Sequence, residues 1–454
     1  MLVPRPSRPR SELRTRLTQL TLAGMADAPF GALTGGTFAT LLALALGASP
    51  MVVGLLAALP SLGALAPLVA APWLHRMPVR RTALVGLGLG RVAWLVPLAL
   101  LAAPPEWPRP WLFLASATLA AFASAAGGVG WLAWVSDLVP VRLRGRYFGR
   151  RGVATGVAAV VAGAAAGPLL DGRVAAYLPG GERGGFAVLL LVAIGFGVAG
   201  VAGLARVEGP APAAPPEAPC LRGAIREIAR GNLGRYVAFT FVWHLTLNVG
   251  GPFIPVFLVE DLGYSPTAVA LLATVTTAAT LATAQAWGRV ADAGGNLRVM
   301  RLTGLAAATL PAWWIAIGQA PFVGLAAAAH VASGIAWGGF NLAAGNLSLA
   351  LAPAGMRALA LAVLGAATGL GAAAGPVIGG LLLDLLGRHP ELSLGLGAYG
   401  AVFALSTVGR TAAFALLYTV EEPGRHRAGG RPGRSVWLAR PSLPRRRAST
   451  SPAA

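Results

Sequence analysis

The segment from Asp137 to Arg151, DLVPVRLRGRYFGRR, carries five arginines and one acid between two long apolar runs. A short basic turn between apolar runs is typical of a cytoplasmic loop that joins two membrane-spanning helices. Pro140 can end the incoming helix, and Gly145 gives the backbone room to turn. The stretch therefore predicts a multi-pass membrane protein that exposes this segment to the cytoplasm.

A related pattern returns in the second half of the chain. Two Gly-Gly-x-Phe stretches lie at 35–38 and 250–253, and two Gly-Ala-Ala-Ala-Gly-Pro stretches lie at 163–168 and 371–376. Because these spacings are close to half the chain, we infer two copies of one membrane unit. Five further residues recur at a constant spacing of 213 positions, in the pairs Pro140 and Pro353, Arg144 and Arg357, Gly152 and Gly365, Thr155 and Thr368, and Gly156 and Gly369.

The composition places the chain in a membrane. Of its 454 residues 56% are hydrophobic and 11% charged, with a mean hydropathy of +0.68, which exceeds what a soluble protein can bury. The net charge of +20 comes from 36 basic residues, all arginine, concentrated between apolar runs and in the tails. That distribution is typical of cytoplasmic loops, so we expect no nucleic-acid partner. A single cysteine, Cys220, excludes an intrachain disulfide and a multi-cysteine metal site.

Twelve apolar stretches are long enough to cross the ~30 Å hydrocarbon layer as helices. We therefore predict an all-α integral membrane protein with twelve transmembrane helices in two pseudo-symmetric six-helix bundles. The predicted spans are 18–46, 50–74, 82–103, 110–136, 146–170, 185–205, 235–259, 266–289, 298–317, 321–349, 357–383 and 395–419.

The arginines also set the expected orientation and domain limits. With both termini in the cytoplasm, the inner segments hold 30 arginines and the outer loops four, which predicts the plasma (inner) membrane orientation. The expected parts are a cytoplasmic N-tail (1–17), a first six-helix bundle (18–205), a cytoplasmic linker with an interfacial helix (206–234), a second bundle (235–419) and a disordered basic C-tail (420–454).

Over residues 18–419 the chain resembles the major facilitator superfamily. The resemblance rests on the 6+6 layout, on the Asp137–Arg151 loop and on GRVADAGGNLR at 288–298, which is similar to the loop signature of that family. The matching segment between the second and third spans, 75–81, departs from the signature because it lacks the glycine and the acid. Residues 163–168 are similar to a helix motif associated with antiporters, with Asp171 where a closing glycine is expected.

The resemblance implies a secondary transporter that works by alternating access and a latch that closes its inner side. We expect Asp292 to lie against a helix N-terminus, where a carboxylate is favoured by the helix dipole. The latch candidates are Asp137, Arg144, Gly288, Asp292, Arg298 and Arg357.

Asp27 is the only acid deep in a predicted span, and Arg91 is expected at a similar depth. A charge in hydrocarbon costs ~2.5 kcal/mol or more, so each of these residues needs a partner or a role. Asp27 could bind a proton or cation that drives transport, or it could form a structural ion pair with Arg91. The sequence leaves both readings open.

Other polar and aromatic residues in the spans are weaker candidates for a cavity wall. His244 and Asn248 share one helical face, and the repeat places His244 near the counterpart of Asp27. Amides and tryptophans in spans also serve simply to pack helices. We expect Arg410 to be peripheral, with its guanidinium reaching towards the inner surface. The remaining candidates are Gln285, Asn341, Trp134 and Trp337.

The sparse polarity of the spans favours an apolar or amphiphilic small-molecule solute, with protons as the candidate coupling ion and export as the candidate direction. The alternatives are a small-metabolite uptake permease and a non-transporting membrane receptor or scaffold. A membrane enzyme is disfavoured because the sequence has no ATP-binding loop and no catalytic or metal-ligand cluster. We expect a monomer without cofactor or metal, embedded in a bilayer with an anionic inner leaflet.

Overall fold

The computed structural model describes residues 10–63, 78–140, 143–170, 176–207, 231–320, 322–353 and 356–423, and within these ranges the chain is helical with no strand. The predicted all-α fold class is confirmed. The start of the N-tail, the predicted interfacial helix and the tail beyond Pro423 lie outside the described residues. The same holds for the side chains of Asp137 and Arg144.

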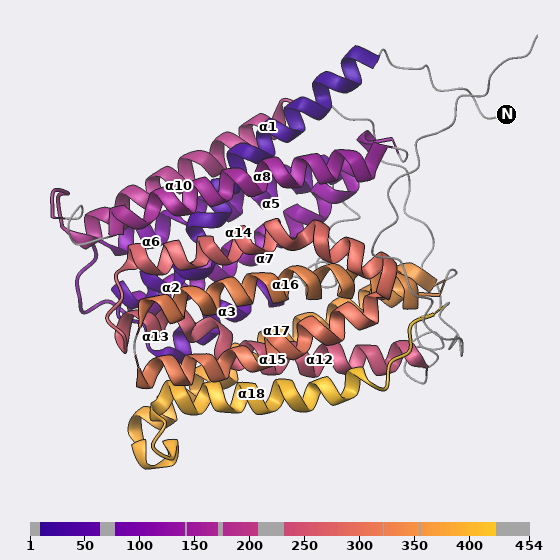
Figure 1. Cartoon of the computed structure of the whole chain (residues 1–454). Helices are drawn as coiled ribbons and strands as arrows, with labels where there is room; N and C mark the ends of the chain where they lie inside the picture. Colours follow the sequence, from indigo (N-terminus) through magenta and orange to yellow (C-terminus); the bar gives the residue numbers. More distant parts are fainter. Residues whose placement is uncertain are drawn as a thin grey trace, which may run out of the picture. The chain divides into compact units, whose positions relative to one another are not determined.

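The helices of the two halves follow the predicted spans (Figure 1). The first half contains α1 (Arg10–Thr34), α2 (Gly36–Ala45), α3 (Pro50–Gly63), α5 (Val79–Val92), α6 (Leu95–Leu100), α7 (Arg109–Leu138), α8 (Arg144–Ala166), η2 (Gly167–Leu170) and α10 (Glu182–Ala205). The second half contains α12 (Asn232–Gly250), η3 (Gly251–Phe253), α13 (Ile254–Glu260), α14 (Pro266–Gly294), α15 (Asn296–Gln319), α16 (Val323–Leu351), α17 (Arg357–Arg388), η5 (Pro390–Ser393) and α18 (Gly397–Leu417).

Ten of the described helices or helix pairs are long and apolar enough to cross a membrane. Helices α1 and α2, bent by 43° at their junction, make an eleventh span if they are counted together. The 14-residue apolar helix α3 lies in the predicted second span, and the rest of that span, 64–74, lies outside the described residues.

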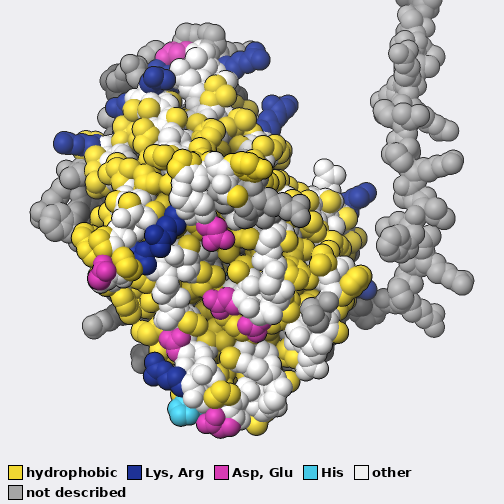
Figure 2. All heavy atoms as spheres, turned by 90° about the vertical axis from the view of Figure 1, so that its left-hand side faces the viewer, with side chains coloured by type: hydrophobic (Ala, Val, Ile, Leu, Met, Phe, Trp, Pro, Cys, Tyr) yellow, Lys and Arg dark blue, Asp and Glu magenta, His cyan; other side chains and the backbone are white. Residues whose placement is uncertain are grey.

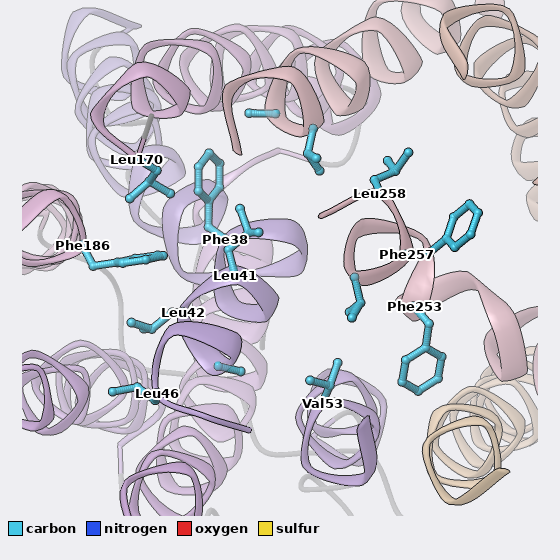
Figure 3. Close-up of a cluster of buried hydrophobic side chains, with 14 of the residues drawn as sticks. Phe38, Leu41, Leu42, Leu46, Val53, Leu170, Phe186, Phe253, Phe257 and Leu258 are labelled. Atoms are coloured by element: carbon cyan, nitrogen blue, oxygen red, sulfur yellow. The ribbon is translucent and has the colours of Figure 1, made fainter. Parts of the chain in front are cut away.

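The repeated Gly-Gly-x-Phe stretches mark the break in the first span of each half. Gly36 follows the end of α1 and has a φ of 49°, a left-handed conformation that favours glycine. In the second half the corresponding residues form the short turn η3, where Pro252 has no N–H to continue the helix. Phe38 and Phe253, the last residues of the two stretches, are both buried, with exposed fractions of 7% and 0% (Figure 3). The repeat in the sequence therefore marks a helix break in both halves, although the backbone conformation at the break differs between them.

The predicted loop between the spans 266–289 and 298–317 is shorter than expected. The predicted span 266–289 continues to Gly294 as α14, and only Gly295, with a φ of 92°, separates it from α15. Asp292 therefore lies on the last turn of a helix and not in a loop.

The hydrophobic cores of the two halves join at one end of the helices and are separate at the other. The shared core lies away from the starts of α1 and α12 and contains Phe38 and Leu42 together with Phe253 and Phe257 (Figure 3). Towards the other end, one cluster contains only first-half residues, among them Trp134, and another contains only second-half residues, among them Trp243. The halves are thus packed together at the end opposite the start of α1 and the end of α18.

Close helix approaches between the halves depend on glycine. A methyl group on Gly54 of α3 would overlap the backbone carbonyl of Pro376 of α17, and one on Gly380 would lie 2.6 Å from the carbonyl oxygen of Pro50. Gly167, at the end of α8, lies against α14, where an added Cβ would be 3.2 Å from the Cβ of Ala270. Small residues permit this spacing in membrane proteins.

Replacement of Gly380 by alanine is expected to lower the melting temperature of the purified protein by several degrees. The added methyl group would force α3 and α17 apart, and such overpacking costs about 1–3 kcal/mol. Gly365→Ala on the same helix is the control, because nothing lies within 4 Å of its added Cβ. Equal melting temperatures for the two variants would show that the close approach does not stabilise the joined end.

Candidate functional site

Asp27 and Arg91 form an ion pair between α1 and α5. The Nη2 atom of Arg91 donates to both carboxylate oxygens of Asp27, at 2.8 Å and 2.7 Å, and Nε donates to Oδ1 at 3.1 Å. A further Nη1 donor reaches the carbonyl of Leu87 at 3.1 Å and Oγ of Ser124 at 3.3 Å. The guanidinium also stacks over the ring of Phe30, 4.8 Å from its centroid. The structure therefore brings together the two charges that the sequence placed at similar depth.

The side chains of Arg91 and Asp27 differ in how far they are exposed. The side chain of Arg91 is 6% exposed, whereas that of Asp27 is 36% exposed. Asp27 lines a cavity of about 190 Å³ together with Trp131 and Arg151, whose guanidinium carbon lies 4.6 Å from the centroid of the Trp131 ring. The carboxylate of Asp27 is therefore paired with Arg91 on one side and open to a cavity on the other.

Helix α10 covers the pair through two glycines. A Cβ on Gly197 would lie 2.6 Å from Cγ of Arg91, and a Cβ on Gly200 would lie 2.7 Å from Cβ of Asp27. Both distances are far below van der Waals contact, so only glycine allows α10 to pack directly over the pair. Gly197 and Gly200 therefore let α10 pack close to α1 and α5, and this packing also fixes the position of Asp27.

A larger cavity of about 550 Å³ lies in the second half. Four of the predicted candidates line it, namely His244, Asn248, Trp337 and Asn341. Nδ1 of His244 lies 2.8 Å from the carbonyl oxygen of Thr240, and because a carbonyl only accepts, Nδ1 carries the hydrogen in this bond. The neutral ring then keeps its lone pair on Nε2. The amide of Asn248 donates back to the carbonyl of His244 at 2.7 Å.

A third cavity, of about 720 Å³, is lined mainly by residues of the first half. Aromatic residues, among them Phe30, Trp94 and Phe113, and small residues form most of its wall. Gly251 and Pro252, from the break in the seventh predicted span, line both this cavity and the 550 Å³ cavity. The broken helix is therefore the wall that the two larger cavities share.

Two predicted cavity residues lie elsewhere. Trp134 is 1% exposed and packs in the first-half cluster with Leu20 and Ala83. Gln285 is exposed on α14. Neither residue lines any of the three cavities described here. Helical spacing cannot distinguish a tryptophan that faces a cavity from one that faces its own bundle.

The N-terminus of α15, which follows the latch segment, binds the carboxylate of Glu422. The carboxylate of Glu422 accepts from the backbone N–H of Asn296 at 3.0 Å and of Leu297 at 3.1 Å, at the start of α15. An anion at this position is favoured by the helix dipole and satisfies two free N–H groups. Asp292, Arg298 and Arg357 are exposed, and Gly288 is partly exposed. Glu422 lies three residues beyond the predicted end of the bundle.

Arg410 is the second residue that sequence reasoning missed. It was expected at the periphery, but it is 3% exposed and lines the 550 Å³ cavity. Its position in an apolar run, with Ser406 one turn earlier, is the signal that could have placed it, since the same reasoning identified Arg91.

The family model of the Major Facilitator Superfamily matches this chain over residues 20–246 and again over residues 236–453. The chain belongs to the major facilitator superfamily. A comparison with curated protein sequences gives no match.

Solved structures of major facilitator transporters share the fold at low sequence identity. One is a bacterial homologue of the human lysosomal transporter Spinster, inward-facing and unoccupied, with 18% identity, a TM-score of 0.64 and coverage of 91% of this chain and 95% of that one. A bacterial homologue of the iron transporter ferroportin, inward-facing, has 14% identity, a TM-score of 0.66 and coverage of 90% and 99%. A D-xylose-proton symporter has 15% identity, a TM-score of 0.68 and coverage of 89% and 97%.

Membership of this superfamily establishes the general activity. The chain is a multi-pass membrane protein and a secondary transporter of small molecules, and it is not an enzyme. The predicted two-bundle architecture is confirmed.

Proposed function

We propose that this transporter exports an amphiphilic organic solute in exchange for protons, by alternating access. The observation that carries the proposal is the Asp27–Arg91 pair, in which one face of the carboxylate is open to a cavity. The two larger cavities, with aromatic walls and a few amide and imidazole groups, suit a solute with an apolar body and a small polar part.

We further propose that the end where the halves are separate faces the cytoplasm, so that the structure represents an inward-facing state of the inner membrane. The arginine bias supports this orientation. The opposite end, which faces the viewer in Figure 2, shows both acidic and basic side chains on a largely hydrophobic surface. Labelling of single cysteines at Arg146 from inside and Gly387 from outside, in a Cys220-free background, tests the orientation. Reversed labelling would contradict it.

The unit of transport in this proposal is a monomer. The arginines of the inner segments would hold the protein against an anionic leaflet.

The direct test of this function is solute flux. A thermal-shift screen of the purified protein against a solute library identifies binders, and proteoliposomes with an imposed pH gradient then measure their movement. We expect uphill movement of at least one binder, coupled to proton movement. Binding without any flux would support a receptor or scaffold, and uphill entry towards the Arg146 side would support an uptake permease.

We propose that the last turn of α14 and the start of α15 form part of the inner latch, with Asp292 and Arg298 as its charges and with Gly288 allowing close approach. Arg144, Arg357 and Asp137 would contribute from the corresponding segments of the two halves. The exposed positions of Asp292 and Arg357 are consistent with a latch that is open in this state.

Asp292→Asn is expected to slow transport severalfold and to leave solute affinity and melting temperature nearly unchanged. A latch shifts the equilibrium between inward-facing and outward-facing states without touching the solute. Glu391→Gln, at an exposed acid near the opposite end, is the control. The latch role is refuted if the turnover of Asp292→Asn equals that of the wild type.

A further inference from the structure

Arg410 of α18 is a buried cation held by neutral groups. Its Nε donates to Oγ of Ser406 at 3.1 Å, Nη1 donates to the carbonyl of Ala307 at 2.9 Å, and Nη2 donates to the carbonyl of Leu247 at 3.1 Å. These bonds use three of the five N–H donors of a guanidinium. In the part of the chain that the structure describes, no carboxylate pairs with Arg410.

The first half also contains a buried arginine, but that arginine has a carboxylate partner. There the buried Arg91 is neutralised by Asp27, at 2.7 Å. Arg410 joins α12, α15 and α18, and the first two are the repeat counterparts of α1 and α5, which carry the Asp27–Arg91 pair. Burial of an arginine at this depth without a counter-charge is costly. The second half therefore has the cation of such a pair and lacks its anion.

The cavity that Arg410 lines gives an anion a place to bind beside it. Among the described residues of that 550 Å³ cavity there is no aspartate or glutamate. Its polar groups include the amides of Asn248 and Asn341, whose N–H groups can donate to the oxygens of an anion. Trp314, Trp337 and Phe403 supply an aromatic wall.

We propose that this cavity binds the solute as an organic anion, with a carboxylate or similar oxyanion against Arg410 and an apolar body against the tryptophans. This inference rests on the proposed function and adds the charge class of the solute. A planar guanidinium matches a carboxylate with two parallel hydrogen bonds. A cavity of this volume and wall composition is far larger than an inorganic ion needs, which favours an organic anion with a hydrophobic body.

The test compares each carboxylate with its neutral amide. Calorimetry on the purified full-length protein uses 2-naphthoate and decanoate, with 2-naphthamide and decanamide as isosteres and inorganic phosphate as the small-anion probe. We expect at least one carboxylate to bind about tenfold or more tightly than its amide, and phosphate to bind more weakly than that carboxylate. Quenching of tryptophan fluorescence gives a second readout, since two tryptophans line the cavity.

Three variants assign the preference to Arg410. Arg410→Gln should remove the preference for carboxylate over amide, whereas Arg388→Gln, at an exposed arginine, should keep it. Asn248→Asp supplies a carboxylate on the wall of the same cavity and remains informative if Arg410→Gln does not fold. It should weaken carboxylate binding about tenfold and leave amide binding unchanged.

The inference is overturned if no carboxylate binds more tightly than its amide, if phosphate competes equally well, or if the preference persists in Asn248→Asp. Flux measurements separate this failure from failure of the proposed function. Proteoliposomes that move a neutral or cationic solute, with no preference for anions, would retain the transporter proposal and discard the anion site. If no binder showed any flux, the export proposal would be discarded. The calorimetric comparison of carboxylate and amide would still test the anion site.

Discussion

Asp27→Asn is expected to abolish uphill transport driven by a pH gradient and to leave solute binding intact. Asparagine keeps the shape of a protonated aspartate but cannot release a proton. Downhill exchange of solute should survive, because exchange needs no proton release. The measurements are pH-driven flux, solute exchange and melting temperature in the same proteoliposome and detergent preparations.

The alternative role for Asp27, as a structural partner of Arg91, predicts a different result. Loss of one partner of a buried ion pair costs about 3–5 kcal/mol, and we expect less here because the Asp27 side chain is 36% exposed. The single variant would then melt at a lower temperature, and the double variant Asp27→Asn with Arg91→Gln would recover folding. Normal pH-driven transport by a stable Asp27→Asn protein would rule out coupling. Active pH-driven transport by the double variant would show that the pair is only structural.

Gly200→Val is expected to give the second large effect, a loss of pH-driven transport together with lower stability. The side chain would collide with Asp27, because even a Cβ at position 200 lies 2.7 Å from the Cβ of that residue. Helix α10 would have to move or Asp27 would have to leave Arg91, and either change disrupts the proposed proton site.

Gly195→Val on the same helix is the matched control, since nothing lies within 4 Å of its added Cβ. It should retain transport and melt close to the wild type. Both variants change a helical glycine to valine, so the difference in helix propensity cancels when they are compared. If Gly200→Val transported as well as Gly195→Val, close packing of α10 over Asp27 would not be needed for coupling.

Most of the architecture could be predicted because it follows from local sequence patterns. Apolar length fixes the spans, and the repeat of Gly-Gly-x-Phe identified equivalent sites that proved to be helix breaks. The pairing of Asp27 with Arg91 followed from the cost of charge in hydrocarbon, which leaves few partners at the right depth.

The remaining features depend on how helices rotate and pack, which composition does not determine. Trp134 faces its own bundle, and Arg410 faces a cavity, although both lie in apolar runs. Glu422 reaches the start of α15 from a position 125 residues further along the chain than Leu297. Neither helical periodicity nor charge counting contains information about such distant contacts.

The central claim is that the halves must separate at their joined end during transport. A disulfide between Gly167→Cys and Ala270→Cys, in a Cys220→Ser background, would hold that end closed, because the Cβ atoms would lie 3.2 Å apart across the two halves. The control disulfide, between Gly63→Cys and Ala125→Cys, lies within the first half at 3.5 Å. The decisive measurement is flux of a screened binder after oxidation. We predict that the first disulfide stops flux until a reductant restores it and that the control does not. Undiminished flux through fully cross-linked protein at 167 and 270 would contradict alternating access by these two halves.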